Sequence, residues 1–348
     1  MVQVMGRNRG NTAGVPVDFV IAWVDGSDEA WLREKRKYEP EDSSEYEKKW
    51  TDGDSRYRDW GLLRYWFRGV ERFAPWVRYI WFVTWGHVPS WLNVKHPKLR
   101  IVRHEEYIPP EYLPTFSSHT IELNLHRIPG LAEHFVYFND DMFLTGPVKE
   151  TDFFRNGQPC DTAVLLPVTL KQNGVRAEIN DLYVINEFFE KRKVMRNHPE
   201  VWYSLKYGRL LLRTLLLTPF RLFPGFFISH LPCSYRKQTF SEVWEKVPEI
   251  LDRTCRHRFR ETTDVNQWLF EYWQFCKGIV PRRPEIGMYY EGKDTFRKMC
   301  GDIAMQKYRM VCCNDSPDIY DFDTARKMLH KAFRKILPEK SSFEKNEK

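Results

Sequence analysis

The chain has 348 residues, of which 42% are hydrophobic, so it can bury a full core and is not a mainly disordered chain. One large domain, or one domain with a substantial insertion, is expected at this length. The formal net charge of +7 suits anionic partners such as nucleotide-sugars or phospholipid head groups. Nucleic acid is excluded as a partner, because the sequence contains no finger, basic zipper or RNA-binding signature.

The seven cysteines are odd in number and form no C-x-x-C pair, and no signal peptide is recognisable. Reduced thiols in a cytoplasmic protein are therefore expected, rather than a disulfide or zinc framework. No segment reaches the roughly 18 to 20 apolar residues that span a bilayer. The closest is 210–228, which arginines and prolines interrupt.

The first predicted element is a buried strand over 19–24, which follows a flexible arm at 1–15 and runs into Asp25 and Gly26. The end of the first strand of an α/β enzyme commonly holds a nucleotide. We therefore assign Asp25 and Gly26 to substrate binding. A hairpin turn is the structural alternative, because Asp-Gly also favours turns.

A charged stretch over 29–55 is predicted to form a helix and then a mobile loop. Asp59 can cap a second helix, whose apolar residues recur at positions 62, 63, 66, 67 and 70. Strands follow at 79–84 and 99–102. This alternation of strands and helices predicts an α/β fold with a parallel, Rossmann-like nucleotide-sugar transferase core.

The central segment is predicted to be a helix that begins at Ser117 or Ser118 and stops at 129–130, before an aromatic strand at 135–138. That strand ends in Asn139, Asp140 and Asp141. Two carboxylates and an amide at a strand end are hard oxygen ligands at the edge where α/β sheets bind their ligands. A solvated turn is the alternative interpretation.

The helix of the same segment carries Glu122, His126 and Arg127. Glu122 and His126 are one helical turn apart and would share a face. Helix and strand end are therefore predicted to converge on one polar site.

Residues 185–228 are predicted to form a mainly helical insertion in which basic and apolar residues alternate. Its cations are Lys191, Arg192, Lys193, Arg196, Lys206, Arg209, Arg213 and Arg221. Such a region suits an anionic membrane surface. A solvated basic face on an insertion packed against the core is the alternative.

Four blocks of this sequence, spread in order over 18–335, resemble the Stealth family of sugar-phosphate transferases. The first is the Trp-Val-Asp-Gly run at 23–26, and the second spans 113–143, with Asp59 and Arg64 matching the pattern that precedes it. The third joins His230-Leu-Pro to Arg260 and Asp264, and the last contains Asn314-Asp315. Trp60 and Leu62 or Leu63 depart from the usual Asn and Glu of the family.

The resemblance implies transfer of a sugar-1-phosphate from a UDP-sugar to a hydroxyl of a glycan acceptor, which releases UMP and forms a phosphodiester. The family includes bacterial capsular polysaccharide phosphotransferases and the catalytic subunit of the lysosomal-enzyme N-acetylglucosamine-1-phosphotransferase. Such chemistry needs charge neutralisation on the diphosphate and a base for the acceptor proton. The expected cofactor is Mg²⁺ or Mn²⁺, and a lipid-linked acceptor would bring the enzyme to the membrane.

The resemblance and the residue chemistry together assign roles to individual side chains. Asp140 and Asp141 are predicted to bind the cation, with Asp315 as a further ligand. Arg127 and Arg260 would hold phosphate oxygens. His230 is the preferred general base and Asp59 the alternative, although an isolated histidine more often has a structural role. The predicted substrate-binding residues are Asp25, Gly26, Arg64, His126, Asn139 and Asp264.

The predicted organisation is a single catalytic domain over 16–335, followed by a disordered tail at 336–348. Within the domain, 16–170 would form the nucleotide-sugar core and 229–335 would complete the active site. The expected location is the cytoplasm, with peripheral contact to the inner face of the plasma membrane. Two rival functions remain: a glycosyltransferase that releases UDP, and a non-catalytic glycan- or membrane-binding protein.

Overall fold

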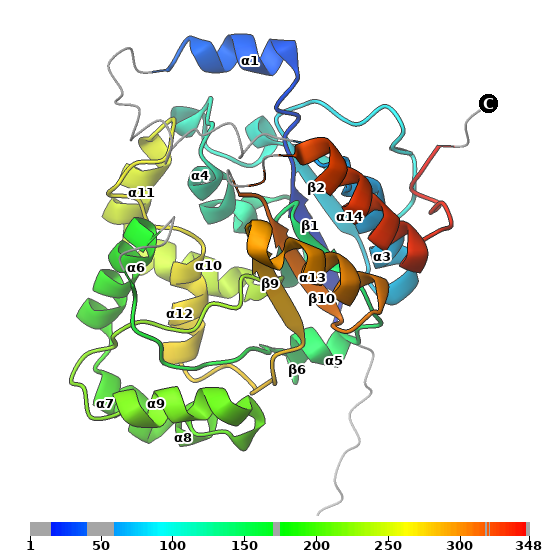
Figure 1. Cartoon of the computed structure of the whole chain (residues 1–348). Coiled ribbons are helices and arrows are strands. Elements are labelled where there is room, and N and C mark those ends of the chain that lie inside the picture. Colours follow the sequence, from blue (N-terminus) through cyan, green and yellow to red (C-terminus); the bar gives the residue numbers. More distant parts are fainter. Residues whose placement is uncertain (1–14, 40–58, 170–174, 317–318, 320, 346–348) are drawn as a thin grey trace, which may run out of the picture.

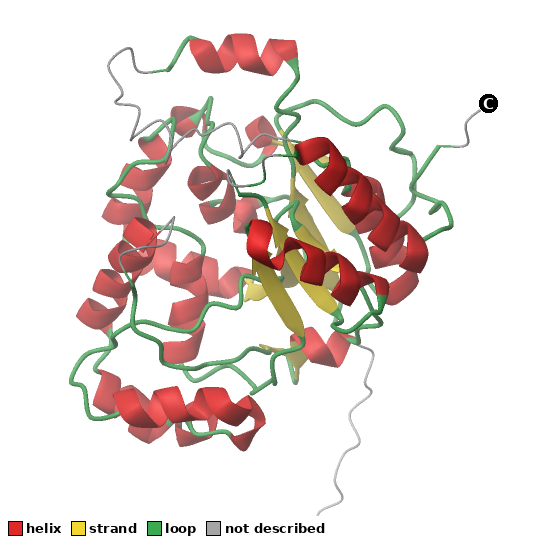
Figure 2. Ribbon diagram, in the orientation of Figure 1, coloured by secondary structure: helices red, strands yellow, loops and turns green. Residues whose placement is uncertain are grey.

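The computed structural model describes residues 15–39, 59–169, 175–316, 319 and 321–345. Residues 1–14 of the arm predicted at 1–15, most of the loop predicted within 29–55, and residues 346–348 lie outside these ranges. Figure 1 shows the order of the elements, and Figure 2 shows helices on both sides of the central strands.

The main sheet has five strands in the order β3-β2-β1-β4-β8. The first four are parallel: β1 (Val17–Ala22), β2 (Ile80–Thr84), β3 (Leu99–Arg103) and β4 (His134–Phe138). The edge strand β8 (Cys233–Arg236) is antiparallel to β4. The predicted α/β fold with a Rossmann-like parallel core is confirmed.

The main sheet separates two hydrophobic cores, because successive side chains of a strand point to opposite faces. Phe19 and Ile21 of β1 belong to one core, and Val20 belongs to the other. The strand β4 alternates in the same way. Both faces of these strands are buried, which explains why they read as nearly continuous apolar runs in the sequence.

A second sheet continues directly from β4. It contains β5 (Met142–Leu144), which is antiparallel to β10 (Met310–Asn314), and β9 (Gly287–Glu291), which is parallel to β10. A short hairpin joins β6 (Phe154–Arg155) to β7 (Gln158–Pro159). Residues 139–141 therefore form the joint between the two larger sheets.

Helices cover the two cores. One core is covered by α3 (Leu63–Phe73), α13 (Lys293–Ala304) and α14 (Phe322–Ile336), and the other by α4 (Ser118–Leu123), α10 (Lys237–Lys246), α11 (Pro248–Arg256) and α12 (Trp268–Cys276). The remaining described helices include α1 (Glu29–Arg36) and α5 (Glu150–Phe153).

The predicted insertion is helical. It contains the end of α6 (Val175–Phe188), then α7 (Lys191–Asn197), α8 (Pro199–Trp202), a 3₁₀ turn at Leu205–Leu210 and α9 (Leu211–Leu217). Val194 and Trp202 anchor it in the same core as α12. None of the described helices is long and apolar enough to cross a bilayer.

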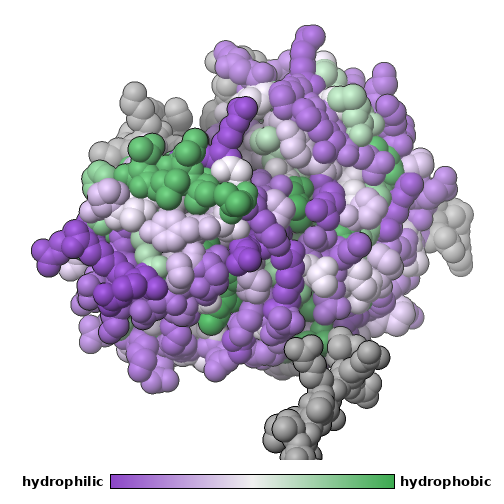
Figure 3. All heavy atoms as spheres, turned by 90° about the horizontal axis from the view of Figure 1, so that it is seen from below, coloured by the Kyte–Doolittle hydropathy of each residue, from purple (hydrophilic) through white to green (hydrophobic). Residues whose placement is uncertain are grey.

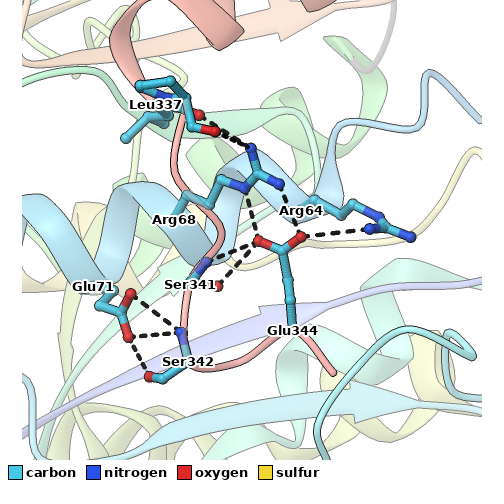
Figure 4. A network of polar contacts seen from close by, with 8 residues as sticks. Arg64, Arg68, Glu71, Leu337, Ser341, Ser342 and Glu344 are labelled. Atoms are coloured by element: carbon cyan, nitrogen blue, oxygen red, sulfur yellow. Dashed lines mark hydrogen bonds and ion pairs between the residues drawn. The ribbon is translucent and has the colours of Figure 1, made fainter. Parts of the chain in front are cut away.

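The prediction of a disordered tail at 336–348 is wrong for residues 336–345: Ile336 ends α14, and the residues after it pack against α3 (Figure 4). Phe343 is buried and its ring lies 5.2 Å from that of Phe67. The buried carboxylate of Glu344 accepts hydrogen bonds from Arg68 Nε at 2.7 Å and Nη2 at 2.9 Å. The polar composition misled the prediction, because one aromatic side chain and one bidentate ion pair are enough to order a short segment.

We expect Glu344→Ala to lower the free energy of unfolding by about 3 kcal/mol, because it leaves the Arg68 guanidinium, whose side chain is only 12% exposed, without its carboxylate partner. Chemical denaturation measures this loss. Burial alone would raise the pKa of Glu344, but the hydrogen bonds from Arg68 and Ser341 lower it below its usual value of 4.5. The stabilisation is therefore present above pH 4.5 and is lost as the pH falls through the lowered pKa.

The matched control for this measurement is Glu105→Ala, which removes an ion pair with Arg103 whose side chains are 68% and 55% exposed. This change should alter stability by less than about 0.5 kcal/mol. Equal losses in the two variants would show that the tail does not stabilise the domain.

Candidate active site

The candidate site lies where the strand order of the main sheet reverses. After β1 the chain continues to β2 and β3 on one side, and then crosses to β4 on the other side of β1. Ile21 and Phe138 are register partners, so Asp25, Gly26 and Asn139 follow the carboxyl ends of neighbouring parallel strands. Open α/β sheets bind their ligands at such a crevice.

The first strand leads into a helix rather than a hairpin, so the hairpin alternative is wrong. Asp28 caps α1 by accepting a hydrogen bond from Trp31 N at 2.8 Å. The Asp25 amide donates to His87 Nε2 at 2.8 Å, and the Asp25 carboxylate accepts from Ser27 N at 2.9 Å. Burial lowers the pKa of His87, so this ring is neutral and can accept. Sequence reasoning missed His87, which holds the turn in shape.

The two carboxylates after β4 have different surroundings. Asp140 is exposed as a whole residue, but its pKa is raised to about 7. Burial of its carboxyl group is the main cause, and the negative charges of Asp141 and Asp59 add to it. Asp141 is half-buried, and its Oδ2 accepts from Cys312 Sγ at 3.2 Å. Its other oxygen, Oδ1, is buried without a hydrogen-bond partner among the described residues. The site is thus crowded with negative charge that a cation would neutralise.

His230 meets Asp141 from a distant part of the chain. One ligand atom from each of Asp141, His230 and Cys312 lies within 4.8 Å of the other two. The rings of Trp268 and Tyr289 lie 5.8 and 5.1 Å from the His230 ring and limit its movement. Sequence reasoning missed Cys312, because the adjacent pair Cys312-Cys313 has none of the spacings that indicate a metal site.

Burial and the neighbouring Asp141 carboxylate raise the pKa of Cys312 well above its usual range. Its thiol therefore stays protonated and acts as a hydrogen-bond donor to Asp141. Mg²⁺ and Mn²⁺, the cations expected here, prefer oxygen ligands to thiolate sulfur. Asp141 and His230 remain as the candidate cation ligands of this group of three.

Asp59 and Asp315 stand at the edge of the same site. Asp59 does not cap α3, which begins at Leu63 with Leu62 in the capping position; it accepts from Gly61 N at 2.6 Å. Asp315 follows β10, where Cys313 N donates to the Asp141 carbonyl at 2.8 Å. Asp315 lies outside the convergent group of three, so its role as a cation ligand stays a prediction.

A chain of polar contacts connects Arg260 with β4. Arg260 Nη2 donates to Ser118 Oγ at 2.5 Å, and Tyr137 Oη donates to Glu122 Oε1 at 3.0 Å. Burial raises the pKa of Glu122 to about 7, although the charge of Arg260 acts in the opposite direction. Glu122 also interacts with Ser118, so these contacts link Arg260 through α4 to Tyr137, two residues before Asn139. The contact of Arg260 with phosphate stays a prediction. Ser118 and Tyr137 were missed as positioning residues.

Asp264 has a different role from the predicted one. It is fully buried, and its carboxylate contacts His119 Nδ1 at 3.0 Å and His257 Nδ1 at 2.7 Å, and accepts from Glu261 N at 2.9 Å. A carboxylate with these partners orients two imidazole rings and the turn that carries Arg260. The structure therefore makes Asp264 a positioning residue rather than one that binds substrate.

His126 and Arg127 do not reach the strand end, which corrects two predicted roles. The ring of His126 lies 5.5 Å from that of Phe240, and Phe240 is 5.5 Å from Phe135, at the opposite end of β4. The Arg127 guanidinium lies 4.8 Å over the Trp244 ring. Burial lowers the pKa of His126 to about 3, so it is a neutral packed ring.

His126 and Arg127 lie away from the strand end because α4 ends at Leu123. The buried Asn124 side chain donates a hydrogen bond to the Thr120 carbonyl at 2.8 Å. In a continuing helix, this carbonyl would instead accept from the backbone N–H of Asn124, so the side chain competes with the helix. Residues 125–127 form a separate 3₁₀ turn. Glu122 and His126 consequently point to different places, although their spacing is that of one helical turn.

Arg64 is also engaged elsewhere than predicted. Its Nη1 lies 3.4 Å from Glu344 Oε2, and its guanidinium lies 4.9 Å over the Trp91 ring. Figure 4 shows this side chain beside the tail. We therefore assign Arg64 to the contact between α3 and the tail rather than to substrate binding.

Three conserved regions of Stealth proteins match this chain: region 1 over residues 15–43, region 2 over 56–161 and region 3 over 229–273. Together they contain Asp25, Asp140, Asp141, His230 and Arg260. These matches confirm the resemblance to Stealth proteins for the first three of the four sequence blocks.

Several named relatives match almost the whole chain. The chain is 40% identical over 331 residues to the capsular polysaccharide phosphotransferase WcwK of Streptococcus pneumoniae, covering 94% of this chain and 98% of that protein. It is 41% identical over 332 residues to the receptor polysaccharide phosphotransferase WefC of Streptococcus gordonii, with 94% and 98% covered.

The exopolysaccharide phosphotransferase of Lactiplantibacillus plantarum is 38% identical over 332 residues, covering 94% of this chain and 96% of that protein. Among solved structures, the galactosyltransferase LgtC in complex with donor and acceptor sugar analogues is 9% identical, with a TM-score of 0.39, and covers 90% of this chain and 95% of that one. From the conserved regions and these relatives, the chain belongs to the Stealth protein family.

Proposed function

We propose that this protein transfers a sugar-1-phosphate from a UDP-sugar to a hydroxyl of a glycan acceptor, in the synthesis of a capsular or extracellular polysaccharide. Three relatives that match at least 94% of this chain are named polysaccharide phosphotransferases. The observation that carries the proposal is the meeting of Asp141, His230 and the Asp140 strand end at the point where the sheet order reverses.

The reaction would use the side chains of this site as follows. The acceptor hydroxyl attacks the phosphorus nearest the sugar, and the bond from that phosphorus to the bridging oxygen breaks. UMP leaves with the bridging oxygen, the sugar keeps one phosphate, and His230 takes the acceptor proton. Arg260, held by Ser118, would contact the phosphate oxygens.

Asp140 and Asp141 would bind Mg²⁺ or Mn²⁺. The fit rests on the unpartnered, buried Oδ1 of Asp141 and on the surroundings of Asp140, whose pKa is raised by burial and then by the charges of Asp141 and Asp59. Carboxylate oxygens are the ligands that these hard cations prefer. The bound cation would neutralise charge on the diphosphate during transfer. His230 is the general base in this scheme, and Asp59, whose charge acts on Asp140, is the alternative base.

The nucleotide product distinguishes this proposal from a glycosyltransferase. A glycosyltransferase attacks the anomeric carbon of the sugar, so both phosphates leave together as UDP. We expect acceptor-dependent UMP when the protein is incubated with a panel of UDP-hexoses and UDP-N-acetylhexosamines, Mg²⁺ and a capsular oligosaccharide. Anion exchange separates the nucleotides, and phosphorus NMR detects the phosphodiester in the glycan.

Two controls sharpen this experiment. Arg260→Ala should remove both UMP and the phosphodiester, whereas Arg127→Ala should retain both, because Arg127 packs on Trp244 away from the strand end. UDP as the sole acceptor-dependent product would establish the glycosyltransferase instead. Binding of every UDP-sugar without turnover would point to a non-catalytic protein.

A further inference from the structure

The insertion presents an apolar surface that the protein leaves uncovered. Figure 3 views the molecule from below, the side on which α7, α8 and α9 lie in Figure 1, and shows hydrophobic side chains gathered on one part of this face. Within 205–222 the exposed large apolar residues are Leu205, Leu212, Leu215, Leu216, Phe220 and Leu222, which we call the apolar ridge. Leu205 is 88% exposed and Leu216 is 75% exposed.

Hydrogen bonds from buried side chains hold α9, which carries much of the ridge, against the rest of the protein. Buried Thr214 accepts from Leu165 N at 3.1 Å, which fixes the inner face of α9. The buried Lys191 ammonium donates to the carbonyls of Leu217, Thr218 and Phe220 at 2.6 to 3.1 Å, which holds the end of the helix. Leu212, Leu215 and Leu216 occupy positions i, i+3 and i+4, so the opposite face of α9 turns them outward together.

The segment that carries the ridge is strongly basic. Residues 191–222 contain eight Lys or Arg and a single acidic residue, Glu200. Lys191 is buried, and the other seven cations are exposed: Arg192, Lys193, Arg196, Lys206, Arg209, Arg213 and Arg221. Exposed leucines with arginines beside them are typical of surfaces that insert into a lipid interface and contact anionic head groups.

We propose that the apolar ridge docks the protein on an anionic membrane surface, with its leucines among the acyl chains and the cations of the same segment on lipid phosphates. A second copy of the chain fits less well. A symmetric dimer through the ridge would face the same cations against one another, and like charges across an interface are unfavourable. The ridge lies on the side of the molecule away from α1, which follows the carboxyl end of β1 and so marks the side of the candidate active site (Figure 1). The docking therefore needs no assumption about the reaction.

Vesicle flotation tests this docking. The whole protein should bind vesicles of phosphatidylcholine that contain about a third phosphatidylglycerol, and it should bind pure phosphatidylcholine vesicles at least about tenfold more weakly. Binding should weaken at high salt, since screening acts on the cations. Leu212→Gln with Leu216→Gln should reduce the partition coefficient more than about tenfold, because two exposed leucines no longer enter the apolar layer.

The cations have a separate test. Arg209→Gln and Arg213→Gln should each weaken binding to the anionic vesicles about fivefold and leave binding to neutral vesicles unchanged. The matched control is Met305→Gln, an apolar side chain that is 67% exposed on a different element. It should bind vesicles like the unmodified protein. Thermal unfolding confirms that each variant is folded.

Three outcomes would overturn the proposal. One is no binding to anionic vesicles at low salt, and another is equal binding by the unmodified protein and the Leu212, Leu216 double variant. The third is a stable dimer in light scattering that the double variant dissociates, since the ridge would then be an interface between copies. The readout contains no turnover, so this result and that of the nucleotide assay are independent.

Discussion

Asp141→Asn is expected to lower kcat by about 10³-fold while leaving the fold intact. The change removes one negative charge from the predicted cation site, and charge neutralisation at a transferring phosphoryl group is worth several kcal/mol. The structure adds a reason for choosing Asp141 over Asp140: its Oδ1 is buried without a partner, so the amide would place a donor or a neutral oxygen where a cation ligand is required. Steady-state assays with saturating UDP-sugar measure the loss.

Cation binding to the same variant provides a second readout. Mn²⁺ titration followed by electron paramagnetic resonance should show a site in the unmodified protein that is lost in Asp141→Asn. The control is Asp294→Asn, an exposed carboxylate in the first turn of α13, which should keep both turnover and the cation site. Full activity in excess EDTA would reject a role for a divalent cation.

His230→Ala is expected to lower kcat by about 10²- to 10⁴-fold, the usual contribution of a general base. The ring stands between Trp268 and Tyr289, and its ligand atom lies within 4.8 Å of those of Asp141 and Cys312. It is therefore positioned either to take a proton or to bind the cation. A base must be deprotonated to act, so its removal should also delete one limb of the pH profile of kcat/KM.

The Mn²⁺ titration separates these two roles. If His230 is the base, the His230→Ala variant keeps the cation affinity of the unmodified protein and loses only turnover and the limb of the pH profile. If His230 is a ligand, cation affinity falls as it does in Asp141→Asn. His126→Ala is the control, since that ring packs on Phe240 away from the site, and it should leave kcat and cation affinity unchanged. Normal turnover by His230→Ala would move the role of the base to Asp59.

Local sequence patterns predicted the core well because they depend on short-range physics. A strand that is buried on both faces must be apolar throughout, so 19–24, 79–84 and 135–138 were identifiable without any knowledge of their neighbours. Strands that alternate with helices must run parallel, and their carboxyl ends then meet at one edge. The register of β1 and β4 shows that these two strands, which Asp25 and Asn139 follow, do end at the same edge of the sheet.

Periodicity failed where a side chain competed with the backbone. Spacing alone places Glu122 and His126 on one helical face, but Asn124 takes the Thr120 carbonyl and ends the helix between them. The two residues then lie near opposite ends of β4. The prediction of a disordered tail was wrong for a related reason. Its polar composition gives no sign of the contacts that Phe343 and Glu344 make with Phe67 and Arg68 of α3.

The sequence by itself determined the α/β class, the strand that carries Asn139, Asp140 and Asp141, and the basic character of 191–221. Only the tertiary structure decided that Cys312 and His230 meet Asp141, that Asp264 serves two histidines, and which leucines of the insertion stay exposed. The physical reason is separation along the chain. Periodicity and capping report contacts within a few residues, whereas Asp141 and Cys312 are 171 residues apart and meet only because β5 pairs with β10.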